Sequence, residues 1–366
     1  MLFSKNDNAK TGKVILIAPL DWGLGHAARC IPIIKELQNY PVKVIIAADG
    51  AVKAMLIEEF PQLQFVTLKG YNIKYSKNKR WFLPKLLIQF PKILSSIVKE
   101  HRWLNKVIQE LGISAVISDN RLGLYSNSVF SVYITHQLNI KAGNGISAKI
   151  ATLIHQFYIK NYTQCWIPDY NEKKNMAGAL SHPAISSSKN NYIGCLSRLE
   201  KKKPSENTAQ ILIILSGPEP QRSLFEIMLI KQLEDFMGRV LFVRGLPGTK
   251  EKPQNFQNVV FKNHLTADEL GNAMQGASLI ISRSGYTTIM DLIKLGCKAV
   301  LVPTPGQTEQ EYLAGYLSEK KIFCTMSQEN FSLQRAIEIS KGFSYEMPLF
   351  NMELYKNAVK QLIEKI

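Results

Sequence analysis

The chain has 366 residues, of which 46% are hydrophobic and 20% charged, and its formal net charge is +16. This length predicts two domains, and the apolar content excludes wholesale disorder. No apolar run approaches the ~18 residues of a transmembrane helix, and the run Val14–Leu20 is too short and too early for a signal peptide, so we expect a cytoplasmic protein. The five scattered cysteines lack Cys-x-x-Cys spacing, which argues against a disulfide scaffold and a zinc site.

In chain order, the first half of the sequence alternates short apolar strands with helices. Strands are expected at Lys13–Pro19, Val42–Ala47, Leu63–Thr67, Ala115–Asp119 and Val129–Thr135. Helices are expected at about His26–Asn39, near Ala51–Phe60, over Leu83–Leu111 with a kink at Pro91, and at Ile146–Tyr162. This alternation predicts a parallel sheet that helices cover on both faces.

The pattern restarts after a polar linker, residues 200–207. Strands are expected at Ile211–Leu215, Val240–Val243, Val259–Phe261, Ser278–Ile281 and Ala299–Val302. Helices are expected at Arg222–Phe236, Ala267–Met274, Tyr286–Lys294, Glu309–Ser318 and Asn351–Ile366. We therefore predict an α/β fold with two Rossmann-like domains, 12–196 and 197–350, facing across a cleft, and a helix at 351–366 that packs back on the first domain. Such sheets bind ligands at the carboxyl ends of their strands.

Positive charge is concentrated between Lys69 and Lys106, where ten basic residues accompany a single acid, Glu100. Large aromatic residues are interleaved with these charges: Tyr71, Tyr75, Trp81, Phe82, Phe90 and Trp103. The combination predicts contact with an anionic membrane surface, into which Trp81, Phe82, Phe90 and Trp103 would insert. No RNA-binding aromatic motif is present, so we expect no nucleic-acid partner. The alternative is a solvated loop and helix whose aromatics pack on the domain.

The loop after the first strand contains Gly23-Leu24-Gly25-His26, where glycines let a ligand approach the backbone and a helix start favours negative charge. His26 could act as a general base there, or simply pack or cap the helix. Asp119 ends a strand of the same sheet and could orient His26 and raise its basicity, or cap a helix. His136 also follows a strand and is expected at this edge. Spacing alone also permits a dinucleotide site with Asp49 as its acid.

Three loops of the second domain carry groups suited to phosphates and sugars. Ser282-Arg283-Ser284-Gly285 lies between a strand and a helix, where small hydroxyl residues can cradle a phosphate, although an ordinary capped helix is the alternative. Asp291 lies one to two turns further on and could reach a sugar hydroxyl. Gln310 and Glu311 offer amide and carboxylate groups to a hydroxyl-rich ligand. Ser216-Gly217 is a third candidate for a phosphate-facing loop.

These motifs together resemble the donor site of GT-B glycosyltransferases, and most of all the class that contains the undecaprenyl-diphosphate-muramoylpentapeptide N-acetylglucosaminyltransferase, glycosyltransferase family 28. The two-domain layout, the Gly-x-Gly-His loop and the sequence Gly194–Arg198 before the linker agree with this resemblance. It implies transfer of a sugar from a nucleotide sugar, UDP-linked, to a hydroxyl of a lipid-linked or cell-envelope glycan. It also implies that no cofactor or metal takes part, in agreement with the lack of an Asp-x-Asp pair.

The resemblance assigns a role to each matching residue. The donor diphosphate would be held by Arg198, Ser216, Gly217, Ser282, Arg283, Ser284 and Gly285. The backbone at His264 and Leu265 would recognise the nucleobase of the donor. Asp291, in place of the family's usual Glu, would bind the ribose. Gln310 and Glu311, where the family often has two glutamines, would bind the transferred sugar. His26 would face the acceptor, and its pairing with Asp119 resembles the dyad of plant-type UDP-glycosyltransferases.

One motif departs from the family. The sequence Thr135-His136-Gln137-Leu138-Asn139 differs from the family's His-Glu-Gln-Asn pattern, which indicates an acceptor other than the peptidoglycan lipid intermediate. We expect the enzyme to be peripheral on the inner face of the cytoplasmic membrane. Two other functions are consistent with the sequence: an isomerase like the UDP-sugar 2-epimerases, and a non-catalytic membrane- or RNA-binding scaffold.

Overall fold

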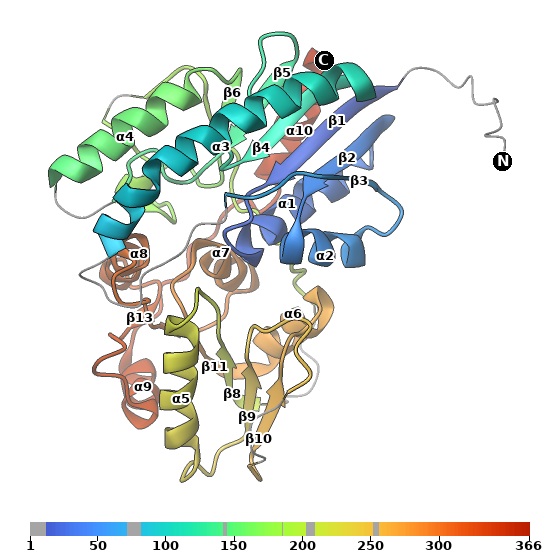
Figure 1. The fold of residues 1–366 in the computed structure, drawn as a ribbon. Coiled ribbons are helices and arrows are strands. Elements are labelled where there is room, and N and C mark those ends of the chain that lie inside the picture. Colours follow the sequence, from blue (N-terminus) through green and yellow to red (C-terminus); the bar gives the residue numbers. More distant parts are fainter. Residues whose placement is uncertain (1–11, 72–81, 142–144, 185, 203–208, 252–255) are drawn as a thin grey trace.

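The structure is a computed structural model, and it describes residues 12–71, 82–141, 145–184, 186–202, 209–251 and 256–366. Within these ranges the chain forms two parallel sheets, each flanked by helices, one in the upper and one in the lower half of the molecule in Figure 1. The predicted α/β architecture with two Rossmann-like sheets is therefore confirmed. Among the described residues, no helix is both long enough and apolar enough to cross a membrane.

The first sheet has seven parallel strands in the order β3-β2-β1-β4-β5-β6-β7. Their bounds are β1 (Lys13–Pro19), β2 (Val42–Ala48), β3 (Gln64–Thr67), β4 (Ile113–Asp119), β5 (Phe130–Ile134), β6 (Gln164–Ile167) and β7 (Asn190–Tyr192). The direction of winding reverses between the neighbouring strands β1 and β4, where Pro19 pairs with Asp119. The loops after these two strands diverge, so a crevice opens between them at the carboxyl edge.

The second sheet has six parallel strands in the order β10-β9-β8-β11-β12-β13. Their bounds are β8 (Ala209–Ile214), β9 (Val240–Val243), β10 (Val259–Lys262), β11 (Ala277–Ser282), β12 (Ala299–Leu301) and β13 (Cys324–Thr325). The winding reverses between β8 and β11, where Ile214 pairs with Ser282. Each half of the chain thus has one reversal point at which a ligand site can form.

Ten α-helices and a short 3-10 helix, η2 (Gly178–Leu180), are present in the described part of the chain. Their bounds are α1 (Leu24–Leu37), α2 (Gly50–Glu59), α3 (Phe82–Leu111), α4 (Gly145–Ile159), α5 (Gln221–Leu233), α6 (Ala267–Gly276), α7 (Tyr286–Leu295), α8 (Thr308–Glu319), α9 (Leu333–Gly342) and α10 (Leu354–Lys365). The sequence analysis missed α9 and the strands β6, β7 and β13, which have only two to four residues. Such short segments carry too little periodicity to predict.

One continuous apolar core holds the two sheets together. It includes Ile31 of α1, Ile289 of α7 and Val359 of α10, all fully buried. The C-terminal helix α10 packs on α1, and Lys13 Nζ donates a hydrogen bond to Ile363 O at 3.0 Å. The helices α1 and α7, which begin at the two crevices, are also in contact. The core therefore fixes the two carboxyl edges against each other.

The basic segment Lys69–Lys106 is described only in part. Tyr75 and Trp81 lie outside the described residues, as do the side chains of Phe82 and Phe90. Trp103 is half-buried and packs against the core that α3 shares with the first sheet. Its insertion into a membrane stays a prediction for the exposed part of the ring.

Candidate active site

The crevice of the first sheet brings together the two residues that the sequence analysis paired. His26 lies in the first turn of α1 and Asp119 is the last residue of β4. His26 Nδ1 lies 2.9 Å from Asp119 Oδ1, and the aspartate is fully buried. Residues 120–141, which follow Asp119, contain no helix, so its alternative role as a helix cap does not apply.

Arg29, one helical turn after His26, holds the same carboxylate. Its Nε donates to Asp119 Oδ2 at 2.5 Å and its Nη2 donates to Oδ1, so the guanidinium binds both oxygens. Arg29 Nη2 also lies 2.9 Å from His26 Nδ1. The sequence analysis missed Arg29, although its spacing of three residues from His26 places both side chains on one face of α1.

The electrostatics of the pair differ from the expectation. Burial alone would raise the pKa of Asp119, but the charge of Arg29 and the hydrogen bonds from Arg29 and His26 hold that pKa well below its usual range. Burial lowers the pKa of His26, and Arg29 lowers it further, against the opposite effect of Asp119. Asp119 thus raises the pKa of His26 as predicted, but burial and then Arg29 outweigh it, so the net pKa of His26 is lowered. We assign neutral His26 the tautomer in which Nδ1–H donates to Asp119 Oδ1, while Arg29 Nη2 donates to the carboxylate, so Nε2 is the nitrogen left to accept a proton.

The polar network continues from the first domain into the second. Arg29 Nη1 lies 3.3 Å from His136 Nδ1, and His136 Nε2 lies 2.7 Å from Glu309 Oε1 at the start of α8. Because a guanidinium only donates, we assign His136 the neutral tautomer in which Nδ1 accepts and Nε2–H donates. Glu309 was also missed by the sequence analysis; its position beside Gln310 was the available signal. His136 therefore lies at the predicted edge.

The glycines of the first loop allow a close contact with the second domain. Gly23 has a φ of 150°, a backbone conformation in which a residue with a side chain would be strained. A Cβ atom on Gly25 would lie 3.0 Å from Thr287 Oγ1, and this hydroxyl donates to Gly25 O at 3.1 Å. The crevice of the first sheet therefore lies directly against the start of α7.

The crevice of the second sheet contains unpaired hydroxyl groups. Gly217, after β8, has φ of 104°, and a Cβ atom there would lie 3.6 Å from Thr304 Oγ1. The buried hydroxyls of Ser282 and Thr304 have no hydrogen-bond partner among the described residues. An unpaired buried hydroxyl is costly, which indicates a site for a polar ligand. Beside the half-buried Ser216 and the start of α7, these donors suit a phosphate group.

Two residues of the 282–285 loop shape the crevice without facing it. The guanidinium of Arg283 is fully buried and donates to Val302 O at 3.2 Å, Pro303 O at 3.3 Å, Gln221 O at 3.0 Å and Gln328 Oε1 at 2.7 Å. The contact between this side chain and the diphosphate that the sequence analysis expected is therefore not available. Ser284 Oγ donates to Gln310 O at 2.8 Å and holds the start of α8, while Gly285 caps α7 with its backbone.

A second polar group forms where the chain crosses between the domains. Asp291 is buried and accepts a hydrogen bond from Ser197 Oγ at 2.5 Å; burial raises its pKa to about 6. Arg198 Nη1 lies 3.4 Å from Glu59 Oε1 of α2, and its charge lowers the pKa of Asp291. Burial, and then Arg198, lower the pKa of the half-buried His264. The structure thus brings Arg198, Asp291 and His264 together, beside the buried Leu265. In the described part of the chain, Arg198 makes no contact with the 282–285 loop that was expected to share the diphosphate with it.

The expected sugar-binding residues are tied to their own loop. Gln310 Oε1 accepts from Thr304 N at 2.9 Å, and Gln310 Nε2 donates to Gln307 Oε1 at 2.5 Å. Glu311 Oε1 accepts from Gly306 N at 3.0 Å. Glu309 is the residue of this loop whose carboxylate contacts the first domain, at His136.

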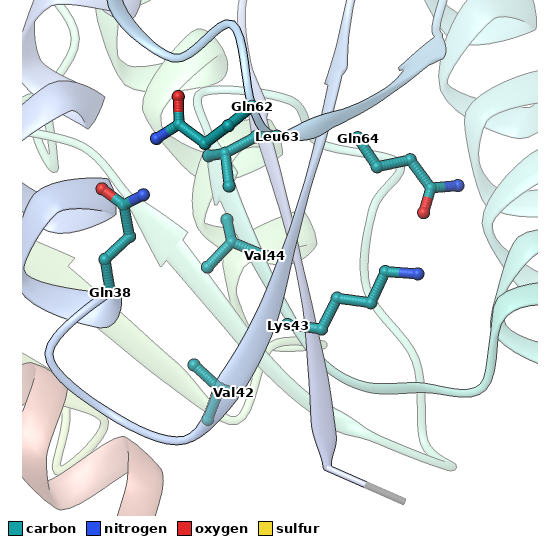
Figure 2. A pocket seen from close by; sticks show the side chains of 7 residues that line it. All are labelled: Gln38, Val42, Lys43, Val44, Gln62, Leu63 and Gln64. Carbon is teal, nitrogen blue, oxygen red and sulfur yellow. The ribbon is translucent and has the colours of Figure 1, made fainter. Parts of the chain in front are cut away.

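A separate hollow of about 330 Å³ lies at the amino ends of β2 and β3. Figure 2 shows the residues that line it: Gln38, Val42, Lys43, Val44, Gln62, Leu63 and Gln64. This is the edge of the first sheet opposite to the crevice with His26, so the hollow has no part in the site.

Comparison with known proteins agrees with this geometry. Residues 213–366 match the model of the glycosyltransferase family 28 C-terminal domain. The chain is 21% identical over 334 residues to the UDP-N-acetylglucosamine--N-acetylmuramyl-(pentapeptide) pyrophosphoryl-undecaprenol N-acetylglucosamine transferase of Francisella philomiragia, with 87% of this chain and 85% of the relative covered. It is 20% identical to the protein of the same name from Rickettsia bellii, with 80% of each covered.

Solved structures show the same fold. The calicheamicin glycosyltransferase CalG4 aligns with a TM-score of 0.63 at 12% identity, over 97% of this chain and 94% of the other. Acinetobacter baumannii MurG aligns with a TM-score of 0.51 at 15% identity, over 96% and 95%. The resemblance that the sequence motifs indicated is confirmed.

Proposed function

From the premise that this chain is a GT-B glycosyltransferase with a family 28 C-terminal domain at residues 213–366, we propose that it transfers a sugar from a UDP-linked donor, such as UDP-N-acetylglucosamine, to a hydroxyl of a lipid-linked or cell-envelope glycan. The observation that carries this proposal is the placement of the half-buried His26, held by the buried carboxylate of Asp119, against the start of α7, where the other sheet has unpaired hydroxyls. A base and an anion site thus lie at one interface.

In the proposed reaction, His26 Nε2 removes the proton from the acceptor hydroxyl, and Asp119 and Arg29 keep the imidazole in place. The acceptor oxygen forms a bond to the anomeric carbon of the sugar, while the bond from that carbon to the diphosphate breaks. The hydroxyls of Ser282 and Thr304 and the backbone N–H groups at the start of α7 would stabilise the negative charge of the leaving diphosphate. This donor set supports a reaction without a divalent ion, and unchanged turnover in EDTA is the expected result.

The acceptor is proposed from the relatives, whose name specifies a pyrophosphoryl-undecaprenol substrate. The segment Thr135–Asn139, which departs from the family pattern, contains His136 and lies at the edge of the acceptor crevice. We therefore propose a lipid-linked glycan that differs from the peptidoglycan intermediate in the part that meets this segment.

A membrane location is supported by one face of α4. Four apolar side chains on this helix are exposed: Ile146 by 72%, Ile150 by 53%, Leu153 by 66% and Phe157 by 67%. Their spacing of four, three and four residues places them in one stripe. Tyr158 of α4 packs against the same small buried cluster as Ile93 and Leu94 of α3, and the two helices lie side by side in Figure 1.

Exposed basic side chains accompany this stripe. They are Lys149 and Lys160 at α4 and Lys92, Lys99, Arg102 and Lys106 on α3. An apolar stripe beside positive charge is the pattern of a helix that lies in the surface of an anionic membrane. We propose that α4, with the basic side chains of α3, places the acceptor crevice next to the lipid.

Calorimetry with UDP-N-acetylglucosamine tests the donor site. The double substitution Ser282→Ala and Thr304→Val should weaken binding at least tenfold, whereas Ser187→Ala, an exposed hydroxyl in the first domain, should leave it unchanged. Unchanged affinity in the double variant would remove the donor-site assignment. Incubation of the donor alone provides a further check, because an epimerised sugar formed without acceptor would identify an isomerase.

A further inference from the structure

We infer that Arg29 is a positioning residue that connects His26 to Glu309 of the second domain, so that a residue of the second domain contributes to the balance of charges at the base. The inference deepens the proposed function and rests on it, because it takes His26 as the base. Three features of the network carry it.

The first feature is that all three nitrogens of the buried Arg29 guanidinium are engaged. Nε and Nη2 hold the two oxygens of Asp119, and Nη1 lies 3.3 Å from His136 Nδ1. A buried cation needs partners of this kind, and the planar fork of arginine can bind a carboxylate and a third acceptor together. A lysine at this position would keep the charge but lose the fork.

The second feature is the contribution of the second domain. Glu309 lies at the start of α8 and accepts from His136 Nε2 at 2.7 Å, and Gln137 Nε2 donates to its other oxygen. This contact fixes His136 with Nδ1 as the acceptor for Arg29. Without Glu309, His136 would lose the acceptor that selects this tautomer, and Arg29 Nη1 would no longer have a nitrogen that is held ready to accept its hydrogen bond.

The third feature is the balance of charges around His26. The groups that interact with it are Arg29 from α1, Asp119 from β4, His136 from the segment after β5, and Glu309 from α8, while Cys30 of α1 contacts Asp119. Removal of the Arg29 charge would leave burial and His136 as the effects that oppose the attraction of Asp119 for a proton on His26, so the pKa of His26 would rise. Removal of the Glu309 charge would act in the opposite direction, from across the domain boundary.

The test is an NMR titration of the histidine Cε1–H signals in the full chain, without any nucleotide sugar. His26→Gln identifies the signal of His26 among the six histidines. Arg29→Met should increase the proton affinity of His26 at least tenfold, and Arg29→Lys should change it less than threefold. A proton affinity in Arg29→Met within twofold of the wild type would overturn the inference.

Glu309→Gln tests the link between the domains, and it decides alone if Arg29→Met does not fold. Because the Glu309 side chain is 31% exposed, this substitution is compatible with folding. It should lower the proton affinity of His26 two- to threefold, whereas Glu346→Gln, an exposed glutamate of the same domain paired with Lys321, should not. An unchanged titration in Glu309→Gln would reject the link. Since the titration needs no substrate, failure of the proposed function would appear separately, as wild-type transfer by His26→Gln.

Discussion

His136 of the first domain stacks face to face on Tyr286 of the second, with ring centroids 4.0 Å apart and an angle of 6° between the planes. Tyr286 OH in turn donates to Pro168 O at 2.7 Å. The start of α7 is therefore fastened to the first sheet beside the network of His26, Arg29 and Glu309. This contact joins the predicted acceptor crevice and the predicted donor crevice into one site.

Replacement of the base should remove most of the turnover. His26→Gln keeps the size of the side chain but cannot accept the proton, so turnover should fall by roughly 100-fold or more while donor affinity stays nearly constant. Steady-state transfer assays with calorimetry of the donor measure both quantities. Turnover near the wild-type value would make His26 structural.

The pH dependence of transfer should reflect the low pKa of His26. A histidine in water has a pKa of 6.5, and burial and Arg29 lower the pKa of His26 below that value, so more than half of the base is neutral at pH 6.5. The rate at pH 6.5 should therefore exceed half of its value at pH 8. A rate at pH 6.5 that is half of its value at pH 8 would show that Asp119, and not Arg29 and burial, dominates the environment of His26.

Arg283 should matter to folding more than to donor binding. Arg283→Met leaves several buried carbonyl groups without a donor, so the free energy of unfolding should fall by roughly 2–4 kcal/mol. Urea unfolding followed by circular dichroism measures this loss. In the variant that remains folded, UDP affinity should change less than threefold; a larger loss would restore a direct contact between Arg283 and the diphosphate.

Asp291 should make stability depend on pH. Its pKa is about 6 in the folded chain and 3.8 in the unfolded one, so the folded state binds the proton more tightly. This contribution to stability is complete below pH 3.8 and is lost as the pH rises through 6. Relative to Asp291→Asn, the wild type should therefore lose about 1 kcal/mol between pH 5 and pH 8. Parallel pH profiles of the two proteins in urea unfolding would contradict the assignment.

The exposed face of α4 should bind anionic lipid. Vesicles with phosphatidylglycerol should sediment the wild type at low salt, and neutral vesicles should not. Glutamate at Ile150 and Leu153 should abolish this binding. As a matched control, glutamate at Leu224 and Ile227, exposed on α5 by 49% and 54%, should leave it intact. Equal recovery on both kinds of vesicle, or none, would reject the membrane proposal and favour a soluble acceptor.

The sequence by itself determined the architecture and the edge at which the site lies. Short apolar strands that alternate with amphipathic helices specify parallel sheets, and residues directly after such strands must lie at the carboxyl edge. For this reason the order of residues along the chain is enough to assign His26, Asp119, His136 and the 282–285 loop to the carboxyl edges of the two sheets. These inferences depend on local sequence alone.

Only the tertiary structure decided which way the side chains point and which partners they meet. Arg283 follows a strand end as predicted, yet it turns into the core because backbone carbonyls of neighbouring loops surround it. Arg29 and Glu309 are 280 residues apart, and they enter one network because the packing of α1, α7 and α10 sets the two sheets edge to edge. Contacts between distant segments depend on this packing, so the spacing of residues along the chain could not reveal that Arg29 opposes the effect of Asp119 on His26.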